Sequence, residues 1–177
     1  MTINKLGTTI ALTVLASTVA AAQSTVTLLD YKATVPKGWV TAPTTSSMRL
    51  AQYTIPGTHG AVAAEVVVYF FGKGQGGDVA ANLTRWKGQF TPSRGTPVYE
   101  KITRDSTGAI PVTVAEYRGT YARGVGMGDT AAAKPGQSLI AAIAETPRGT
   151  LFFQLFGATE GVSPQRDALI KFAKSLK

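Results

Sequence analysis

The segment 61–71 constrains the fold more than any other part of this sequence. It is apolar at nearly every position, and Glu65 is its only charged residue. Successive side chains of a strand point to opposite faces, so a run that is apolar on both faces predicts a central strand in a sheet covered on both sides. A turn over residues 56–60, with Pro56, Gly57 and Gly60, predicts an antiparallel hairpin between this strand and a strand over 48–55.

Two amphipathic helices are predicted. Asp78 is expected to N-cap the first, whose apolar stripe has spacings of four, three and four residues. That stripe consists of Val79, Leu83, Trp86 and Phe90. The second is expected to begin with Ser163 as N-cap and Pro164 in its first turn. Its stripe consists of Leu169, Phe172, Ala173 and Leu176.

The remaining turn signals separate short strands. Strands are expected over 31–35, 98–104, 110–121, 138–146 and 151–157, with a hairpin turn at 147–150. Residues 122–137, rich in Gly and Ala, are predicted to form a long loop, a kind of segment that is often functional. Short hairpins imply an antiparallel sheet, and two helices can cover its two faces. The sequence therefore predicts an α+β fold, a single-domain α/β/α sandwich with a mainly antiparallel sheet.

Residues 1–22 have the pattern of a cleavable signal peptide. Lys5 is the only charge in the first 29 residues, an apolar run follows it, and Ala20, Ala21 and Ala22 supply small residues for cleavage. The run is shorter than the roughly 20 residues that span a bilayer, although a buried N-terminal helix is an alternative. We expect export to the periplasm or the outside of a bacterial cell, with cleavage after Ala22 or Ala21. Residues 23–177 then form one globular domain without a transmembrane segment.

The composition limits the kinds of partner that the protein is expected to bind. The chain has no cysteine, which excludes disulfides and a cysteine-linked lipid anchor. Loss of Lys5 with the signal peptide lowers the net charge from +8 to +7. A basic domain in this compartment is expected to meet an envelope protein or an anionic cell-surface polymer. Nucleic acid is not expected, because the protein is exported and has no recognition motif.

Several segments resemble a known family. Val35-Pro36-Lys37-Gly38-Trp39 resembles the start of PsbP-like domains. More narrowly, the chain is similar to a group of uncharacterised exported bacterial proteins in three segments: 48–57, 64–72 and 82–90. In the first, Met48-Arg49-Leu50-Ala51 leads to Pro56-Gly57, and in the last Arg85-Trp86-Lys87-Gly88-Gln89-Phe90 stands on the first helix. The resemblance spans roughly residues 31–176. It implies a PsbP-like sandwich, a fold that serves photosystem subunits and a nuclear-import factor by binding other proteins.

The first candidate site is a charged cluster. If residues 55 and 61 pair, Glu65 faces Ala51 and lies diagonal to Arg49, on a face with Tyr53, Val67 and Tyr69. Arg85 on the helix could join them. Charges on an apolar face need partners, since an unpaired buried charge is costly. Arg49, Glu65 and Arg85 are therefore expected to form either a structural ion pair or a cluster that binds a ligand or partner.

The second candidate site is a glycine-rich loop. Gly72, Gly74 and Gly77 formally match the dinucleotide fingerprint between a strand and a helix. The strand belongs to a hairpin rather than a βαβ unit, and Asp78 would repel phosphate at the helix start. A nucleotide site is therefore not expected. The loop with Gly72, Lys73, Gly74 and Gly77 is interpreted as a flexible turn, or as a loop that binds a partner or ligand.

No catalytic, metal or cofactor-binding set is predicted. His59 is the only histidine and there is no Cys, so the usual zinc shell cannot be assembled. No Gly-x-Ser-x-Gly elbow occurs. Paired carboxylates stay open, because Glu100, Glu116 and Glu145 fall on predicted strands. The leading hypothesis is an exported, non-enzymatic binding or interaction domain. The alternatives are a carrier of a small ligand, using the face between sheet and helix or the 122–137 loop, and a carboxylate-based hydrolase.

Overall fold

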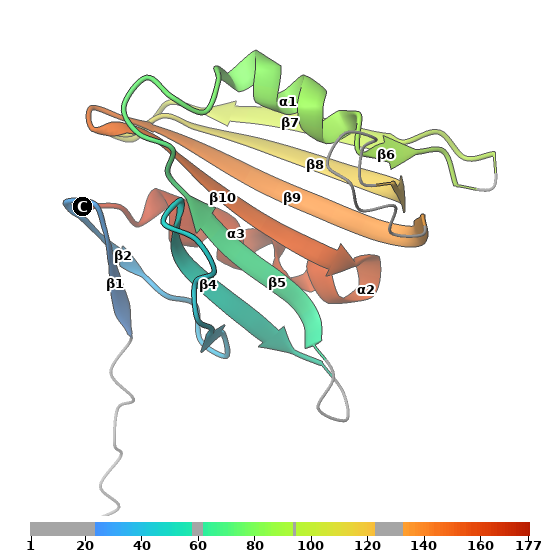
Figure 1. Ribbon diagram of the computed structural model, residues 1–177, viewed down its shortest axis with the longest axis horizontal. Coiled ribbons are helices and arrows are strands. Elements are labelled where there is room, and N and C mark those ends of the chain that lie inside the picture. The colour runs from blue at the N-terminus through green and yellow to red at the C-terminus, as the bar shows by residue number, and fades with distance from the viewer. Residues whose placement is uncertain (1–23, 58–61, 94, 123–132) are drawn as a thin grey trace, which may run out of the picture.

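Strands dominate the computed structural model, which describes residues 24–57, 62–93, 95–122 and 133–177 (Figure 1). The predicted signal peptide, His59 and residues 123–132 of the predicted loop lie outside the described residues. The main sheet has eight strands in the order β3-β4-β5-β10-β9-β8-β6, and β7 also pairs with β8. All its pairings are antiparallel. The bounds are β3 (Val40–Thr41), β4 (Arg49–Pro56), β5 (Val62–Tyr69), β6 (Phe90–Thr91), β7 (Tyr99–Asp105), β8 (Val112–Tyr121), β9 (Lys134–Thr146) and β10 (Gly149–Ala158).

A small N-terminal hairpin is attached to the end of the chain. Strands β1 (Thr25–Leu28) and β2 (Tyr31–Thr34) form their own two-stranded sheet. The backbone N–H of Lys32 donates to the carbonyl of Lys177 at 2.9 Å, and that of Lys177 donates to the carbonyl of Lys32 at 3.1 Å. The N–H of Thr34 donates to Oγ of Ser175 at 2.8 Å. The hairpin is thus fastened to the segment that follows the last helix.

One face of the sheet is covered by the C-terminal helices. These are α2 (Thr159–Val162), a 3-10 turn (Ser163–Gln165) and α3 (Arg166–Lys174). The predicted stripe is buried, and the ring of Phe172 lies 5.3–5.9 Å from the rings of Trp39, Tyr53 and Phe153. The predicted N-cap is wrong: the helical segment begins at Thr159, and Ser163 makes no capping bond with its side chain. Pro164 stands in the first turn of the 3-10 segment that precedes α3, where its fixed φ and missing N–H are tolerated.

The other face is covered in part by α1 (Val79–Lys87). Asp78 caps this helix as predicted, because its Oδ1 accepts from the N–H of Ala81 at 2.7 Å. Trp86 and Phe90 are buried against β8 and β9, although Phe90 already belongs to β6. Helices therefore lie on both faces of the sheet, and the predicted α/β/α sandwich is confirmed (Figure 1).

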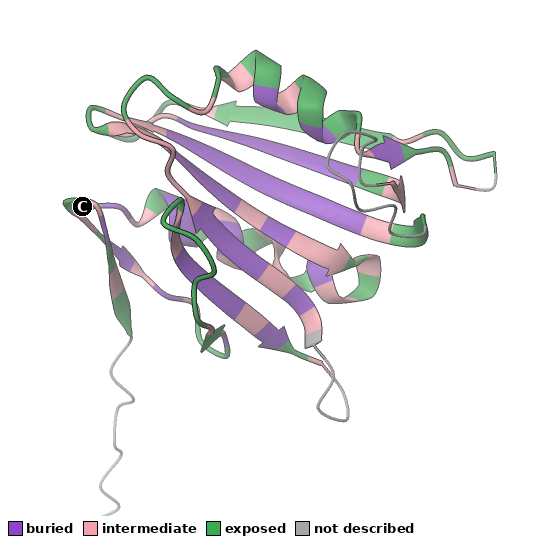
Figure 2. Cartoon of the chain, viewed as in Figure 1, coloured by how far each residue is buried: buried purple, intermediate pink, exposed green. Residues whose placement is uncertain are grey.

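Helix α1 does not extend over β5, so the prediction that this strand is covered on both sides is wrong for the α1 side. On the α3 side of β5, Ala64, Val66 and Val68 are fully buried, as expected for a central strand. On the other side Val67 is buried, but Glu65 and Tyr69 are only partly buried. Figure 2 shows such intermediate segments along β5. Helix α1 packs over β8 and β9, so within the described part of the chain β4, β5 and half of β10 have no helix above them on this side. The sheet is covered on both sides only in part.

The predicted loop over 122–137 is shorter than expected at its C-terminal end. Residues 134–137 already belong to β9, where Lys134 pairs with Tyr121 and Gln137 pairs with Gly119. The strand signal is weak here, because Pro135 and Gly136 are residue types that usually interrupt strands. The strand tolerates them at its exposed end, where residues 134–136 are all exposed.

Candidate functional site

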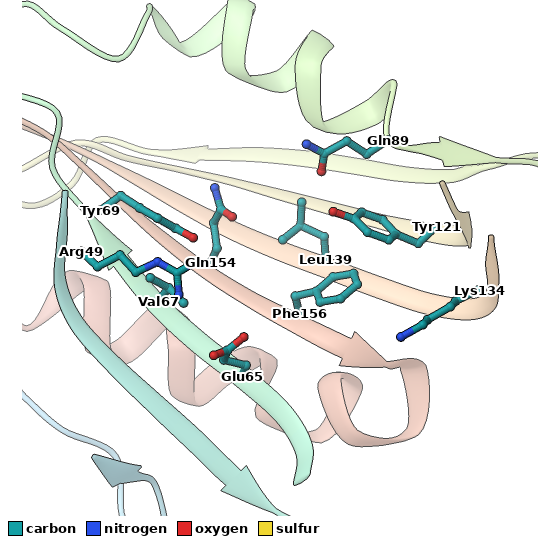
Figure 3. Close-up of a pocket in the computed structure, with 10 residues that line it drawn as sticks. All are labelled: Arg49, Glu65, Val67, Tyr69, Gln89, Tyr121, Lys134, Leu139, Gln154 and Phe156. Carbon is teal, nitrogen blue, oxygen red and sulfur yellow. The ribbon is translucent and has the colours of Figure 1, made fainter. Parts of the chain in front are cut away.

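A hollow of about 300 Å³ lies on the uncovered part of the sheet (Figure 3). Its walls come from four neighbouring strands of the sheet, the end of β8 and the residue before β6. They consist of Arg49, Glu65, Val67, Tyr69, Gln89, Tyr121, Lys134, Leu139, Gln154 and Phe156. We call this hollow the sheet pocket. Its volume is at the lower end of the range of about 300–1,000 Å³ typical of ligand pockets, so it fits a small molecule.

Strand register decides which side chains reach the sheet pocket. Ile55 pairs with Ala64, and Glu65 pairs with Thr54 rather than facing Ala51. The predicted pairing of residues 55 and 61 is therefore wrong by three positions. Since three is odd, the predicted neighbour Tyr53 turns to the other face of the sheet, where it packs against Phe172.

Arg49 reaches the Glu65 side because of an irregularity in β4. The register shifts between Arg49, which pairs with Tyr69, and Ala51, which pairs with Val68. The extra residue reverses the alternation of side chains beyond it. Arg49 and Glu65 thus share a face as predicted, although the reason is a β-bulge and not the regular pairing.

A third side chain, Gln52, joins these two. Nη1 of Arg49 donates to Oε1 of Gln52 at 2.9 Å, and Nε2 of Gln52 donates to Oε1 of Glu65 at 2.5 Å. Among the described residues no direct ion pair forms between Arg49 and Glu65. The sequence prediction missed Gln52, although a glutamine between Ala51 and Tyr53 in an expected strand was a usable signal. The structure buries it, and buried amides need partners. We call Arg49, Gln52 and Glu65 the polar relay.

The structure places Arg85 outside the sheet pocket. Its guanidinium donates to Oδ1 of Asn82 on the same helix, and it is not among the lining residues. The buried Asn82 in turn donates from Nδ2 to the carbonyls of Gly76 at 2.9 Å and Asp78 at 2.8 Å. Arg85 therefore belongs to a network that organises the start of α1. The prediction that it joins Arg49 and Glu65 does not match this geometry.

The glycine-rich loop has a conformational explanation. Gly72, Gly74, Gly76 and Gly77 all have φ between 72° and 106°, a region that L side chains rarely adopt. Lys73 is exposed. Asp78 already accepts from the N–H of Ala81 in the first turn of the helix, so a phosphate would meet a carboxylate there. The turn interpretation agrees with this geometry, and binding by Gly72, Lys73, Gly74 and Gly77 stays a prediction.

The sheet pocket has a polar side and an apolar side. Arg49 lies with its guanidinium carbon 5.5 Å from the ring centre of Tyr69, within the range of a cation–π contact. Across the hollow the rings of Tyr121 and Phe156 are 4.5 Å apart, beside the buried Leu139 (Figure 3). Arg49 and Lys134 bring two positive charges and Glu65 one negative charge. The pocket is thus amphipathic, and its described lining residues carry a net charge of +1.

The three carboxylates considered for catalysis lie apart. Glu116 lies on the α3 side and binds Arg166, whereas Glu100 faces the α1 side and binds Lys87. Glu145 pairs with Arg104. Glu100 pairs with Tyr117 on β8, and Tyr117 pairs with Leu139 on β9. Glu145 is six residues beyond Leu139 on β9. At about 3.3 Å per residue this separation is roughly 20 Å. Glycosidase carboxylates stand about 5–9.5 Å apart, so these three form no such pair.

Two other properties follow from the described residues. No group of three or more His, Cys, Asp or Glu side chains within them is placed to hold a metal ion. None of their helices is long and apolar enough to cross a membrane.

The architecture defines the class of protein: it is a PsbP-like α+β fold. The solution structure of cyanobacterial PsbP (CyanoP) from Synechocystis sp. PCC 6803 is similar to this chain with a TM-score of 0.56. The match covers 94% of this chain and 98% of that one at 12% identity. At this identity the likeness establishes the fold. A scan of protein-family models and a search of curated proteins found no match.

Proposed function

We propose that this protein is an exported, non-enzymatic binding domain that holds a small ligand in the sheet pocket. The observation that carries the proposal is the convergence of charged and amide side chains on central strands that no described helix covers on that side. Central strands usually bury apolar side chains under a helix, as β8 and β9 do here. A concave site with apolar walls and a few converging polar groups is typical of ligand binding.

Binding without catalysis is supported by the placement of the acidic groups. Among the described residues, Glu65 is the only carboxylate that lines the sheet pocket, and one of its oxygens already accepts from Gln52. Glu100, Glu116 and Glu145 each pair with a basic side chain elsewhere. A hydrolase that relies on two carboxylates needs both at one site. The sheet pocket offers one.

The location and the wider partners belong to the same proposal. We expect residues 1–22 to direct export and to be removed, so that residues 23–177 work in the periplasm or outside a bacterial cell. The narrower resemblance to exported bacterial proteins in the 48–57, 64–72 and 82–90 segments, which belongs to this proposal, would fit this location. An envelope protein would be the natural partner of such a carrier.

A second candidate function is adhesion to an anionic polymer. The exposed Lys32 and Lys177 lie side by side because their backbones are hydrogen bonded, and the exposed Lys171 lies on the helix that leads to them. Clustered positive charge attracts anionic surfaces in a salt-dependent way. Binding to an anionic cell-wall polymer that weakens when Lys32, Lys171 and Lys177 are changed to Gln would support this function.

A blocked pocket tests the main proposal. Gln154→Trp places a large ring in the sheet pocket without touching the α3 core, and Gln75→Trp makes the same change at an exposed loop residue. Thermal shifts would be measured with a panel of amino acids, organic acids, sugars, fatty acids and nucleosides. We expect one class to raise the melting temperature of the wild type and of Gln75→Trp, but not of Gln154→Trp. A ligand that stabilises all three proteins equally binds elsewhere and contradicts the proposal, as does a panel without any binder.

A further inference from the structure

We propose that the ligand of the sheet pocket is a free α-amino acid with an apolar side chain. This inference rests on the proposed function and names the class of ligand. In this arrangement Arg49 binds the carboxylate, Glu65 binds the ammonium group, and the side chain lies against Tyr121, Phe156 and Leu139.

The polar relay shows what kind of group fits between Arg49 and Glu65. Gln52 bridges them with a single amide, whose oxygen accepts from the guanidinium and whose nitrogen donates to the carboxylate. The two charged groups are therefore spaced for an acceptor and a donor that are joined through one carbon atom, as in the amide of Gln52. The carboxylate and ammonium of an α-amino acid are joined through one carbon atom, which gives the same order and a similar spacing.

The relay also leaves binding capacity on its charged ends. A guanidinium has five N–H donors, and a carboxylate has about four acceptor positions on two oxygens. Gln52 uses one donor of Arg49 and one oxygen of Glu65. Both side chains line the sheet pocket, so a ligand can meet them on the open side (Figure 3). Guanidinium–carboxylate contacts are among the stronger hydrogen bonds, because both partners are charged.

The apolar side of the pocket fits the rest of such a molecule. Arg49 and Glu65 come from β4 and β5, whereas Leu139 comes from β9 and Tyr121 from the end of β8. Phe156 on β10 lies between the two sides and contacts the ring of Tyr121. A polar head near β5 therefore has an apolar surface beside it, within a volume of about 300 Å³. This volume fits a single amino acid better than a long acyl chain.

The charges disfavour the other small anions. A dicarboxylate would set its second carboxylate against Glu65, and a fatty acid would leave Glu65 facing an apolar chain. A sugar would place hydroxyls against Leu139 and Phe156, where they would lose hydrogen bonds to water. Among these classes, a ligand with a positive group beside its negative one gives both Arg49 and Glu65 a partner of opposite charge. Lys134 adds long-range attraction for the carboxylate.

Calorimetric titration of the purified protein tests this inference. L-phenylalanine and L-leucine are expected to bind saturably. N-acetyl-L-phenylalanine, which lacks the ammonium group, and L-phenylalanine amide, which lacks the carboxylate, are each expected to bind at least tenfold more weakly. Equal binding of either derivative would overturn the inference, and so would tighter binding of the dipeptide Phe-Ala, which would indicate a peptide.

Two variants test which side chain binds the ammonium group of the ligand and which binds its carboxylate. Glu65→Gln is expected to weaken binding of L-phenylalanine tenfold or more while leaving N-acetyl-L-phenylalanine unchanged. Arg49→Gln is expected to weaken L-phenylalanine while leaving the amide unchanged. Near-UV circular dichroism checks their folding, and the comparison of derivatives on the wild type stands even if a variant is unfolded. The opposite pairing of variants and derivatives would refute the assigned orientation.

Failure of this inference can be told apart from failure of the proposed function. If amino acids do not bind but another class of the panel does, and Gln154→Trp abolishes that binding, the small-ligand function stands and the amino acid is refuted. If no compound binds in a way that Gln154→Trp removes, both are refuted.

Discussion

The pair formed by Glu116 and Arg166 allows a sharp test of how this fold is held together. Glu116 is 3% exposed and lies on β8 among the apolar residues of the α3 side. Its Oε1 accepts from Nε of Arg166 at 2.8 Å, and its Oε2 is 4.0 Å from Nη2 of Arg118. This contact with Glu116 is the main reason why the pKa of Arg166 is raised above its usual value. The pair connects the sheet to α3.

The expected loss in the free energy of unfolding depends on which charge is left without its partner. Removing one partner of a buried ion pair costs about 3–5 kcal/mol, because the other charge is left without compensation. Arg166 is 31% exposed at its side chain and Arg118 remains near Glu116, so we expect about 2–3 kcal/mol for Arg166→Met. Glu116→Leu leaves Arg166 next to Asp167 and partly in water, and should cost about 1 kcal/mol. The double variant should lie within about 1 kcal/mol of the wild type.

Urea unfolding at pH 7, followed by circular dichroism, measures the free energy of unfolding of all four proteins. The cycle isolates the interaction, for which these expected losses give about 2–5 kcal/mol. Arg118→Met is the matched control, since this arginine is more exposed and 4.0 Å away, and it should cost less than about 1 kcal/mol. An Arg166→Met protein as stable as the wild type would refute this reasoning. So would a double variant that loses the full sum of the two single losses.

Three further predictions concern the glycine-rich loop, Asp105 and Tyr117. Gly74→Ala should lower the free energy of unfolding by about 1 kcal/mol, because its φ is positive. Gly76→Ala should lower it by about 2–3 kcal/mol, because its Cβ would also meet two phenylalanine rings, at 2.7 and 3.1 Å. Equal losses of the two variants in denaturant unfolding would contradict this. The pKa of Asp105 lies well below its usual value, first because Lys174 donates to it, so the carboxylate stabilises the fold above about pH 4 and loses this effect in acid. Asp105→Asn should therefore lower the melting temperature at pH 7, with a gap that narrows below pH 4; a constant gap would speak against the linkage. Burial, followed by the charge of Glu100, raises the pKa of Tyr117 to about 12, so stability is lost as the pH rises from 10 towards 12. The wild type should lose melting temperature faster over that range than Tyr117→Phe, and parallel curves would exclude this cause.

The layers of the fold could be predicted because they depend on local patterns. The stripe of α1 and its cap at Asp78 are set by residues within a few positions of one another, and the structure has both. The start of the last helix could not be placed so well. Thr159–Val162 has no side-chain cap and includes Gly161, which is unfavourable in helices, yet it packs closely against β5. Tertiary packing therefore overrides a weak local preference there.

The candidate site was predicted in part. Arg49 and Glu65 were chosen as charges in apolar strands, and both line the sheet pocket. Gln154, Phe156 and Lys134 were not found, because they come from β9 and β10, far along the chain. Their meeting with β5 depends on the long pairing of β5 with β10, which no local pattern encodes. Gln154 between apolar neighbours had the same kind of signal as Gln52.

The attachment of β2 to residues 175 and 177 has a consequence for the order in which this domain can form. The β1–β2 hairpin finds its backbone partner about 145 positions later, and α3 covers the middle of the sheet only once residues 166–174 are present. A nascent chain that lacks this stretch carries an open apolar sheet face, and contacts between such distant segments form slowly. If the chain crosses a membrane while still unfolded, this dependence keeps the sheet face open until residues 166–177 have followed. Closure of the domain and the arrival of this stretch are then coupled by one short ladder of backbone hydrogen bonds.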